Sequence, residues 1–188
     1  MIDVRRLLVL TIVAGIAGCA GSAPTPAPEP IPAADRAYFE RHPLMVPVAG
    51  YEPGDLDDSF NAPRGGGRIH RATDILAPLG TPVLAAIDGE VLRLSQSPRG
   101  GITAFLVDDE RKYVYYYAHL DHYSDRMTVG LRVRQGHVIG YVGTSGNAPR
   151  DTPHLHFQAM RFGNRRDWWN GPAVDVRSFM TRPGTIRE

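Results

Sequence analysis

The sequence has a single cysteine, no run of basic residues and no apolar stretch long enough to cross a bilayer comfortably. One cysteine excludes an internal disulfide and a cysteine-rich zinc site. Lys and Arg total 21 against 20 Asp and Glu, and this balance gives no reason to expect a nucleic-acid partner. A hydrophobic fraction of 43% over 188 residues is typical of one soluble globular domain with an extension.

Several common catalytic motifs are also missing. No His-Glu-x-x-His helix occurs, so a metal-dependent base of that kind is excluded. The run 142–146 lacks the Gly-x-Ser-x-Gly spacing of a nucleophile elbow. The glycines at 65–67 do not lie between a strand and a helix, which argues against a phosphate-binding loop.

The first 18 residues have the pattern of a secretory signal peptide. Arg5 and Arg6 precede a short apolar core at 7–17, and a proline-rich segment follows soon after. A buried helix of the folded domain is the alternative, but the prolines that follow disfavour it. We therefore expect residues 1–18 to be removed.

The residues around Cys19 resemble the lipobox of bacterial lipoproteins, with the sequence Ile-Ala-Gly-Cys at 16–19. This resemblance implies cleavage before Cys19 and lipid attachment to its thiol and amine, giving a membrane contact through the lipid anchor. Ala20, rather than Asp, follows the cysteine, which in Gram-negative lipoproteins implies the outer membrane, facing the periplasm. An ordinary signal peptide with an incidental cysteine is the alternative.

Proline occupies every second position from 24 to 32, so residues 19–34 are expected to form an extended, solvated linker. A short helix is predicted at 33–41, ending before Pro43. From about Met45 onward, short alternating or apolar runs predict a mostly β domain of antiparallel strands, fewer than ten in number, around one core. The predicted strands are 81–85, 90–94, 102–107, 112–118, 131–133, 138–142 and 154–160. A further short helix is possible near 175–180.

Aromatic residues alternate on the predicted strand 112–118, where Tyr113, Tyr115 and Tyr117 share one face. Packing is the expected role of these tyrosines, although Tyr117 could reach a site at the strand end. Trp168 and Trp169 are expected to pack rather than to stack on a glycan.

Histidines recur in three short motifs, of which His154-Leu155-His156-Phe157 is the simplest to interpret. On a strand, residues two apart share a face, with Cα atoms roughly 6.6 Å apart. Leu155 and Phe157 would then enter the core while both histidines face one cleft. A pair of surface histidines on an exposed strand is the alternative.

The other two motifs contain His70, Asp74 and His119. On a straight strand His70 and Asp74 would lie about 13 Å apart, too far to share an ion, so a sharp bend or helical turn is required. A surface ion pair is equally compatible with their spacing. His119 follows the predicted strand 112–118, and by itself a histidine at a strand end is usually just solvated.

Taken together, the motifs offer His70, Asp74 and His156 as ligands of a zinc ion with one open position, as in catalytic sites. Two neutral imidazoles and one carboxylate leave such a site formally positive, which favours ionisation of bound water. His119 and His154 remain as candidates for acid–base catalysis.

These motifs resemble the lysostaphin-like, or LytM-type, zinc endopeptidases of peptidoglycan. That family has His-x-x-x-Asp, Tyr-x-His-Leu and His-x-His in this order, and the likeness runs from about Ser59 to Gln158. It implies an N-terminal extension at 35–58, a LytM-type domain with a catalytic groove and few short helices at 59–180, and a tail at 181–188. It also implies zinc on His70, Asp74 and His156, with the catalytic residues His119 and His154 beside the scissile amide.

The resemblance departs from the family pattern at Ala72, Gln158 and the loop 147–152, none of which removes a site residue. Our main hypothesis is a zinc-dependent endopeptidase acting on peptide cross-links of peptidoglycan. The alternative is a non-catalytic LytM-type activator of a cell-wall amidase, with a cell-wall hydrolase or divisome partner. A passive envelope lipoprotein that only binds peptidoglycan would leave the paired histidines unexplained.

Overall fold

The computed structural model describes residues 30–164 and 166–184. The predicted signal peptide, Cys19 and the linker up to residue 29 lie outside the described residues. Lipid attachment at Cys19 and the envelope location therefore stay predictions. Within the described part of the chain, no helix is long and apolar enough to span a membrane.

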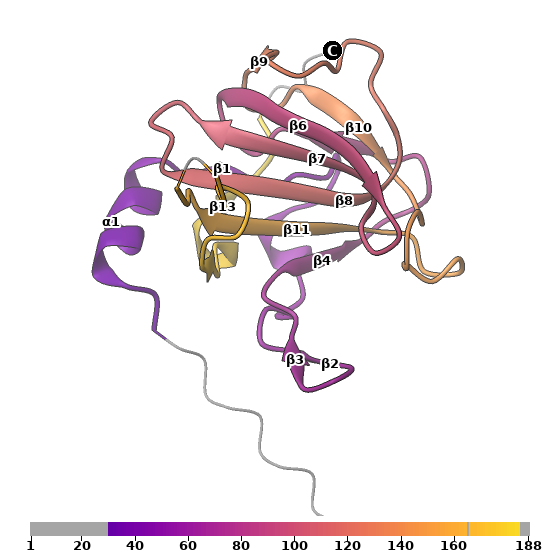
Figure 1. Cartoon of the computed structure of the whole chain (residues 1–188), viewed down its shortest axis with the longest axis horizontal. Coiled ribbons are helices and arrows are strands. Elements are labelled where there is room, and N and C mark those ends of the chain that lie inside the picture. The colour runs from indigo at the N-terminus through magenta and orange to yellow at the C-terminus, as the bar shows by residue number, and fades with distance from the viewer. Residues whose placement is uncertain (1–29, 165, 185–188) are drawn as a thin grey trace, which may run out of the picture.

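A nine-stranded antiparallel sheet organises the protein (Figure 1). Its main path runs in the order β12–β11–β8–β7–β6–β9. The bounds along this path are Ala173–Val174, His154–Arg161, Tyr113–Tyr123, Gly101–Asp108, Gly89–Ser97 and Arg132–Val133. Off the path, β4 (Thr73–Leu76) pairs with β11, and β10 (Val138–Val142) pairs with both β5 (Pro82–Leu84) and β8. The mostly β, antiparallel prediction is confirmed.

Smaller elements complete the fold. The hairpin β2 (Pro63–Arg64) and β3 (Arg68–Ile69) precedes β4, and β1 (Leu44–Met45) pairs in parallel with β13 (Met180–Thr181). The helix α1 spans Ala33–Arg41 as predicted, and two 3-10 turns cover Pro53–Asp55 and Arg177–Phe179. The described residues contain thirteen strands, so the expectation of fewer than ten was wrong. The additional strands are mostly two residues long, too short to show an alternating pattern.

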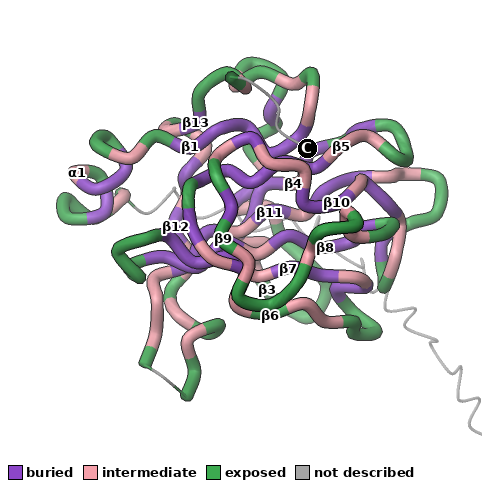
Figure 2. Tube along the Cα trace, turned by 90° about the horizontal axis from the view of Figure 1, so that it is seen from above, coloured by how far each residue is buried: buried purple, intermediate pink, exposed green. Residues whose placement is uncertain are grey.

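The main core lies on one face of the sheet, and Figure 2 shows its buried segments inside a rim of exposed loops. Tyr113, Tyr115 and Tyr117 of β8 all enter it, as their alternation predicted. A second, smaller cluster of Val107, Val114 and Met160 covers part of the opposite face. A strand has two faces, so the intervening residues need their own packing partners.

The N-terminal segment is packed into this core. Tyr38 and Phe39 of α1 are buried, and β1 continues the apolar packing. Asp35 is also buried, where it accepts hydrogen bonds from the Tyr113 hydroxyl at 2.7 Å and from Arg161 Nη2 at 2.6 Å. Burial opposes ionisation of Asp35, but these bonds outweigh it and lower its pKa. These hydrogen bonds connect α1 to β8 and β11.

Candidate active site

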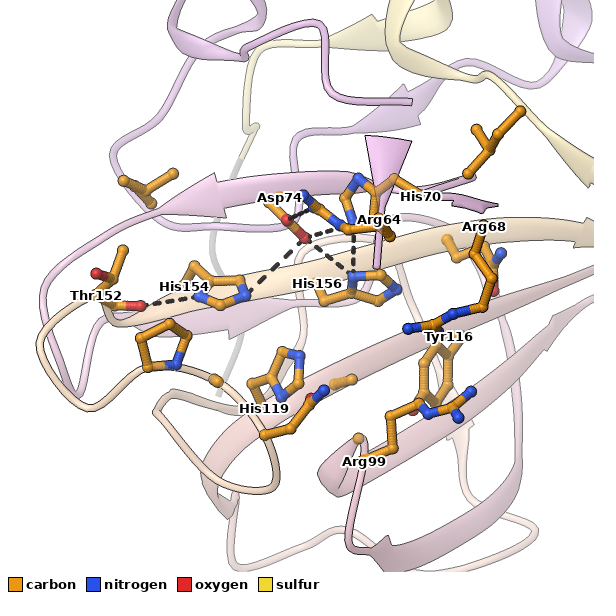
Figure 3. A pocket seen from close by; sticks show the side chains of 18 residues that line it. Arg64, Arg68, His70, Asp74, Arg99, Tyr116, His119, Thr152, His154 and His156 are labelled. Carbon is orange, nitrogen blue, oxygen red and sulfur yellow. Dashed lines mark hydrogen bonds and ion pairs between the residues drawn. The ribbon is translucent and has the colours of Figure 1, made fainter. Parts of the chain in front are cut away.

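Strand β11 carries two of the site histidines into a groove of about 530 Å³ (Figure 3). Leu155 and Phe157 are buried in the main core, while His154 and His156 line the groove on the other side of the strand. This arrangement confirms the alternation predicted from the sequence. It gives the two imidazoles a rigid support, because the side chains between them are fixed by packing.

A kink between His70 and Asp74 provides the sharp bend that their spacing requires. Arg71 has φ of 62°, in the left-handed region that costs energy for a residue with a side chain. Asp74 then lies on β4 directly opposite His156 of β11. As a result His70 Nε2 is 3.0 Å from Asp74 Oδ1, and His156 Nδ1 is 2.9 Å from the same oxygen.

Two residues hold this kink in place. The Ser59 hydroxyl accepts a bond from the Asp74 backbone N–H at 3.0 Å and donates one to the Ala72 carbonyl at 3.3 Å. Gln158 Nε2 donates to the Arg71 carbonyl at 2.9 Å. Ser59 and Gln158 were noted only as part of the family likeness, and their supporting role was missed. Nothing in their local sequence indicates a partner 13 or 87 residues away.

The donor atoms of His70, Asp74 and His156 suit a metal ion. They lie within 4.8 Å of one another, and the two histidine nitrogens are 3.0 Å apart. Tetrahedral zinc with ligands at ~2.0–2.2 Å keeps them roughly 3.3 Å apart, close to the separations in the structure. His70 Nδ1 bonds the Ser59 carbonyl, which can only accept, so in a neutral His70 the Nε2 lone pair faces the other two groups. A cation placed between these nitrogen lone pairs and the Asp74 carboxylate would stabilise the arrangement.

The charges around the three groups favour their metal-binding forms. Burial works to raise the pKa of Asp74, but the adjacent imidazoles of His156 and His70 favour its ionised form and hold this pKa well below its ordinary value. Arg64 Nη2 donates to the other carboxylate oxygen, Oδ2, at 2.6 Å. Burial lowers the pKa of His156, which keeps it neutral and able to offer a lone pair.

His119 lies inside β8, not at a strand end as predicted. Strand β8 continues to Tyr123, and its register against β7 shifts by one residue beside His119, whose φ is 61°. A bulge of this kind re-aims a side chain. His119, which simple alternation would place on the core face with Tyr117, lines the groove instead.

His119 and His154 face each other across the groove, with ring centroids 4.9 Å apart. Each donates from Nδ1 to a backbone carbonyl, His119 to Ser145 at 2.8 Å and His154 to Thr152 at 2.9 Å. In both rings Nε2 therefore remains available to a ligand in the groove. Burial, together with the nearby His154 and His156, lowers the pKa of His119, so its neutral form is able to accept a proton.

Residues 68–171 match the description "Peptidase family M23". The chain belongs to this family. It is 35% identical over 120 residues to an L-Ala–D-Glu endopeptidase of Bacillus subtilis, covering 61% of this chain and 36% of that protein. It is 36% identical over 121 residues to the peptidoglycan DD-endopeptidase ShyC of Vibrio cholerae, covering 64% and 26%. The M23 chain thus spans about a third of the first relative and about a quarter of the second.

Among solved structures, the catalytic domain of the antimicrobial peptidase lysostaphin from Staphylococcus simulans superposes with a TM-score of 0.54. Sequence identity is 26%, and the match covers 76% of this chain and 95% of the lysostaphin domain. The likeness to lysostaphin-like proteins inferred from the motifs is therefore confirmed for this M23 chain.

The tyrosines of β8 separate into core and groove residues in this M23 protein. Tyr117 packs in the core as expected and does not reach the groove, since it is fully buried and its hydroxyl accepts a bond from the Ala86 N–H at 2.9 Å. Its neighbour Tyr116 lines the groove instead, with its ring 6.0 Å from that of His156. Alternation along β8 decides this, since the odd-numbered tyrosines occupy the core.

Proposed function

We propose that this protein is a zinc-dependent endopeptidase that hydrolyses peptide cross-links of peptidoglycan. The observation that carries the proposal is the convergence of five groups in one groove. His70, Asp74 and His156 offer three ligand atoms, while His119 and His154 present Nε2 beside them. The names of the two relatives, an L-Ala–D-Glu endopeptidase and a peptidoglycan DD-endopeptidase, support the substrate class.

Zinc, when bound, would supply a positive charge that polarises the amide carbonyl and makes water more acidic. The backbone bonds on Nδ1 fix the orientation of His119 and His154, so each can hold or move a proton only at Nε2. One of the two, in its neutral form, takes a proton from the attacking water at Nε2, and the other, as the imidazolium, donates its Nε2 proton to the carbonyl oxygen or to the leaving amine. The two rings are held symmetrically enough that either order is compatible with the geometry.

A lipid anchor at Cys19 forms part of the proposal, since it would hold the enzyme in the cell envelope at the outer membrane, next to its substrate. The alternative, a non-catalytic activator of a cell-wall amidase or divisome partner, needs no metal site. The complete ligand set argues against it.

A direct test incubates purified sacculi with a soluble form that begins after Cys19, with and without a zinc chelator. Mass spectrometry of the muropeptides should show cross-linked dimers falling to monomers only without chelator. His119→Ala and His154→Ala should each lower the rate by about 10²- to 10⁴-fold while zinc stays bound. The matched control is His122→Ala, because His122 is exposed and lies outside the groove lining.

Other outcomes separate the alternatives. A double variant, His119→Ala with His154→Ala, that kept full activity would exclude both residues from catalysis. Unchanged muropeptides from a protein that takes up no zinc, but that stimulates an amidase, would favour the activator.

A further inference from the structure

The groove is strongly positive, although the whole chain carries a formal charge of only +1. Three arginines line it, Arg64, Arg68 and Arg99, against a single carboxylate, that of Asp74. Asp74 is already paired with Arg64 and with the site histidines. Positive charge is therefore concentrated where the substrate would lie, and the single carboxylate of the groove does not neutralise it.

Arg68 and Arg99 are the arginines without a partner of opposite charge. Among the described residues, no carboxylate lies within 4.0 Å of either guanidinium. Arg68 uses one of its five N–H groups, donating from Nε to the Gly65 carbonyl at 3.1 Å. Both residues are exposed, so their remaining donors are open to a ligand.

These two arginines lie beyond His156, at the end of the groove away from His154 and Thr152 (Figure 3). Tyr116 lies at the same end of the groove (Figure 3), where burial raises the pKa of its hydroxyl and the charge of Arg99 opposes that rise. The hydroxyl of Tyr116 lies so close to Gly100 that any side chain at residue 100 would collide with this hydroxyl. Arg68 comes from the β2–β3 hairpin, whereas Arg99 comes from the β6–β7 turn.

Two backbone hydrogen bonds fix the turn that carries Arg99. The Asn147 N–H donates to the Arg99 carbonyl at 3.0 Å, and the His119 N–H donates to the Gly100 carbonyl at 2.8 Å. The second of these bonds links the turn directly to the bulge that positions His119. The backbone of Arg99 is thus held at a fixed position relative to His119, so only its side chain must become ordered when it binds a ligand.

We infer that Arg68 and Arg99 bind a carboxylate of the substrate, close to the amide that is cleaved. Guanidinium groups match carboxylates in shape and charge, and two guanidinium groups from different elements can bind the same carboxylate. Arg68, Arg99 and the three candidate ligand residues line the same groove, so a carboxylate held by the two arginines belongs to a part of the substrate near the cleaved amide.

This inference rests on the proposed function and narrows its substrate class. Peptide cross-links that carry a free carboxylate beside the scissile amide are preferred, whereas a bridge made of glycine residues offers none. An amidated peptide, in which that carboxylate is a carboxamide, loses the charge but keeps nearly the same shape.

The test uses two synthetic cross-linked peptides that differ only in this carboxylate or carboxamide. With the zinc-loaded full domain, kcat/KM for the carboxylate peptide should exceed that for the carboxamide by about 10- to 100-fold. Arg68→Gln and Arg99→Gln should each reduce this ratio severalfold, and the double variant should bring it close to one. Arg134→Gln is the matched control, because it removes an exposed charge outside the groove lining and should keep the ratio.

A second measurement is the affinity of the zinc-free protein for both peptides by titration calorimetry. Tighter binding of the carboxylate peptide to the wild type, lost in Arg99→Gln, supports the subsite even if neither peptide is cleaved, an outcome that counts against the proposed function alone. Cleavage of both peptides at equal rates overturns the subsite and leaves the endopeptidase intact. Equal affinities for both peptides, with no cleavage, overturn both proposals.

Discussion

Two aspartates of this protein have lowered pKa values for different reasons, and they have different roles. Asp35 is 3% exposed and is paired with Arg161 and the Tyr113 hydroxyl, neither of which loses its proton near neutral pH. The Asp74 side chain is 19% exposed. One of its oxygens faces two imidazole nitrogens, which can be unprotonated and offer a lone pair to a ligand. Asp35 is therefore satisfied by the protein alone, whereas Asp74 leaves room for a cation.

The two positions also differ in what surrounds them. Asp35 joins a helix to the sheet and does not line the groove that holds Asp74. Asp74 is placed by a backbone kink at Arg71. A strained backbone is maintained only where the neighbouring structure compensates for it, and such places are often functional. The comparison teaches that a lowered carboxyl pKa identifies a site only when its partners are themselves able to bind a ligand.

Asp74→Asn should have the largest effect. It removes the anionic ligand, so we expect zinc affinity to fall by more than about 100-fold and hydrolysis of sacculi to become undetectable. Metal content measured by mass spectrometry after dialysis checks the first expectation. Asp121→Asn changes an exposed aspartate outside the groove lining and should alter neither quantity. A variant at Asp74 that kept both zinc and activity would remove this residue from the ligand set.

Asp35→Asn should act on stability instead. The bonds to Arg161 lose their charge, and we expect the free energy of unfolding to fall by about 2–3 kcal/mol. This is less than the ~3–5 kcal/mol of a fully buried pair, because the Arg161 side chain is partly exposed. Urea denaturation measures the change, while zinc content and activity at 25 °C should be retained.

The control for this variant is Asp109→Asn, which breaks an exposed ion pair with Arg132 and should cost under about 1 kcal/mol. Loss of zinc in Asp35→Asn would contradict the view that Asp35 acts on stability and Asp74 on metal binding.

The smallest effect concerns pH. The folded pKa of Asp35 is lowered from its unfolded value of about 3.9, so ionised Asp35 stabilises the fold fully above about pH 5. This contribution is lost as the pH falls through the folded pKa. The difference in unfolding free energy between wild type and Asp35→Asn should thus be constant from pH 5 to 8 and shrink below about pH 4. Both proteins are compared without zinc, and a difference that stayed flat at low pH would contradict the assignment.

Sequence reasoning was most successful where a short-range period controls the outcome. Alternation correctly placed Leu155 and Phe157 in the core and put His154 and His156 on the groove face. The helix at 33–41 followed from local signals, whereas the predicted helix at 175–180 is only a 3-10 turn at Arg177–Phe179. Strands of two residues escaped detection because two residues contain no period.

Long-range contacts explain what the sequence did not reveal. The bulge at His119 depends on the register between β7 and β8, and it moves this histidine from the core face to the groove. The same strand brings Tyr116, not Tyr117, to the site. Ser59 and Gln158 support the kink from distant positions, and Asp35 meets Arg161 across 126 residues.

Strand periodicity and motif spacing are local properties of the chain, so the fold class, the family likeness and the five candidate site residues could all be predicted from the sequence. The meeting of His70 and Asp74 with His156, and the turn of His119 toward them, could not be predicted in this way. Tertiary contacts also distinguish Asp35, whose partners hold their protons, from Asp74, which faces two imidazoles. Those outcomes depend on a positive φ, a one-residue register shift and hydrogen bonds between distant segments, which form only once the sheet has assembled.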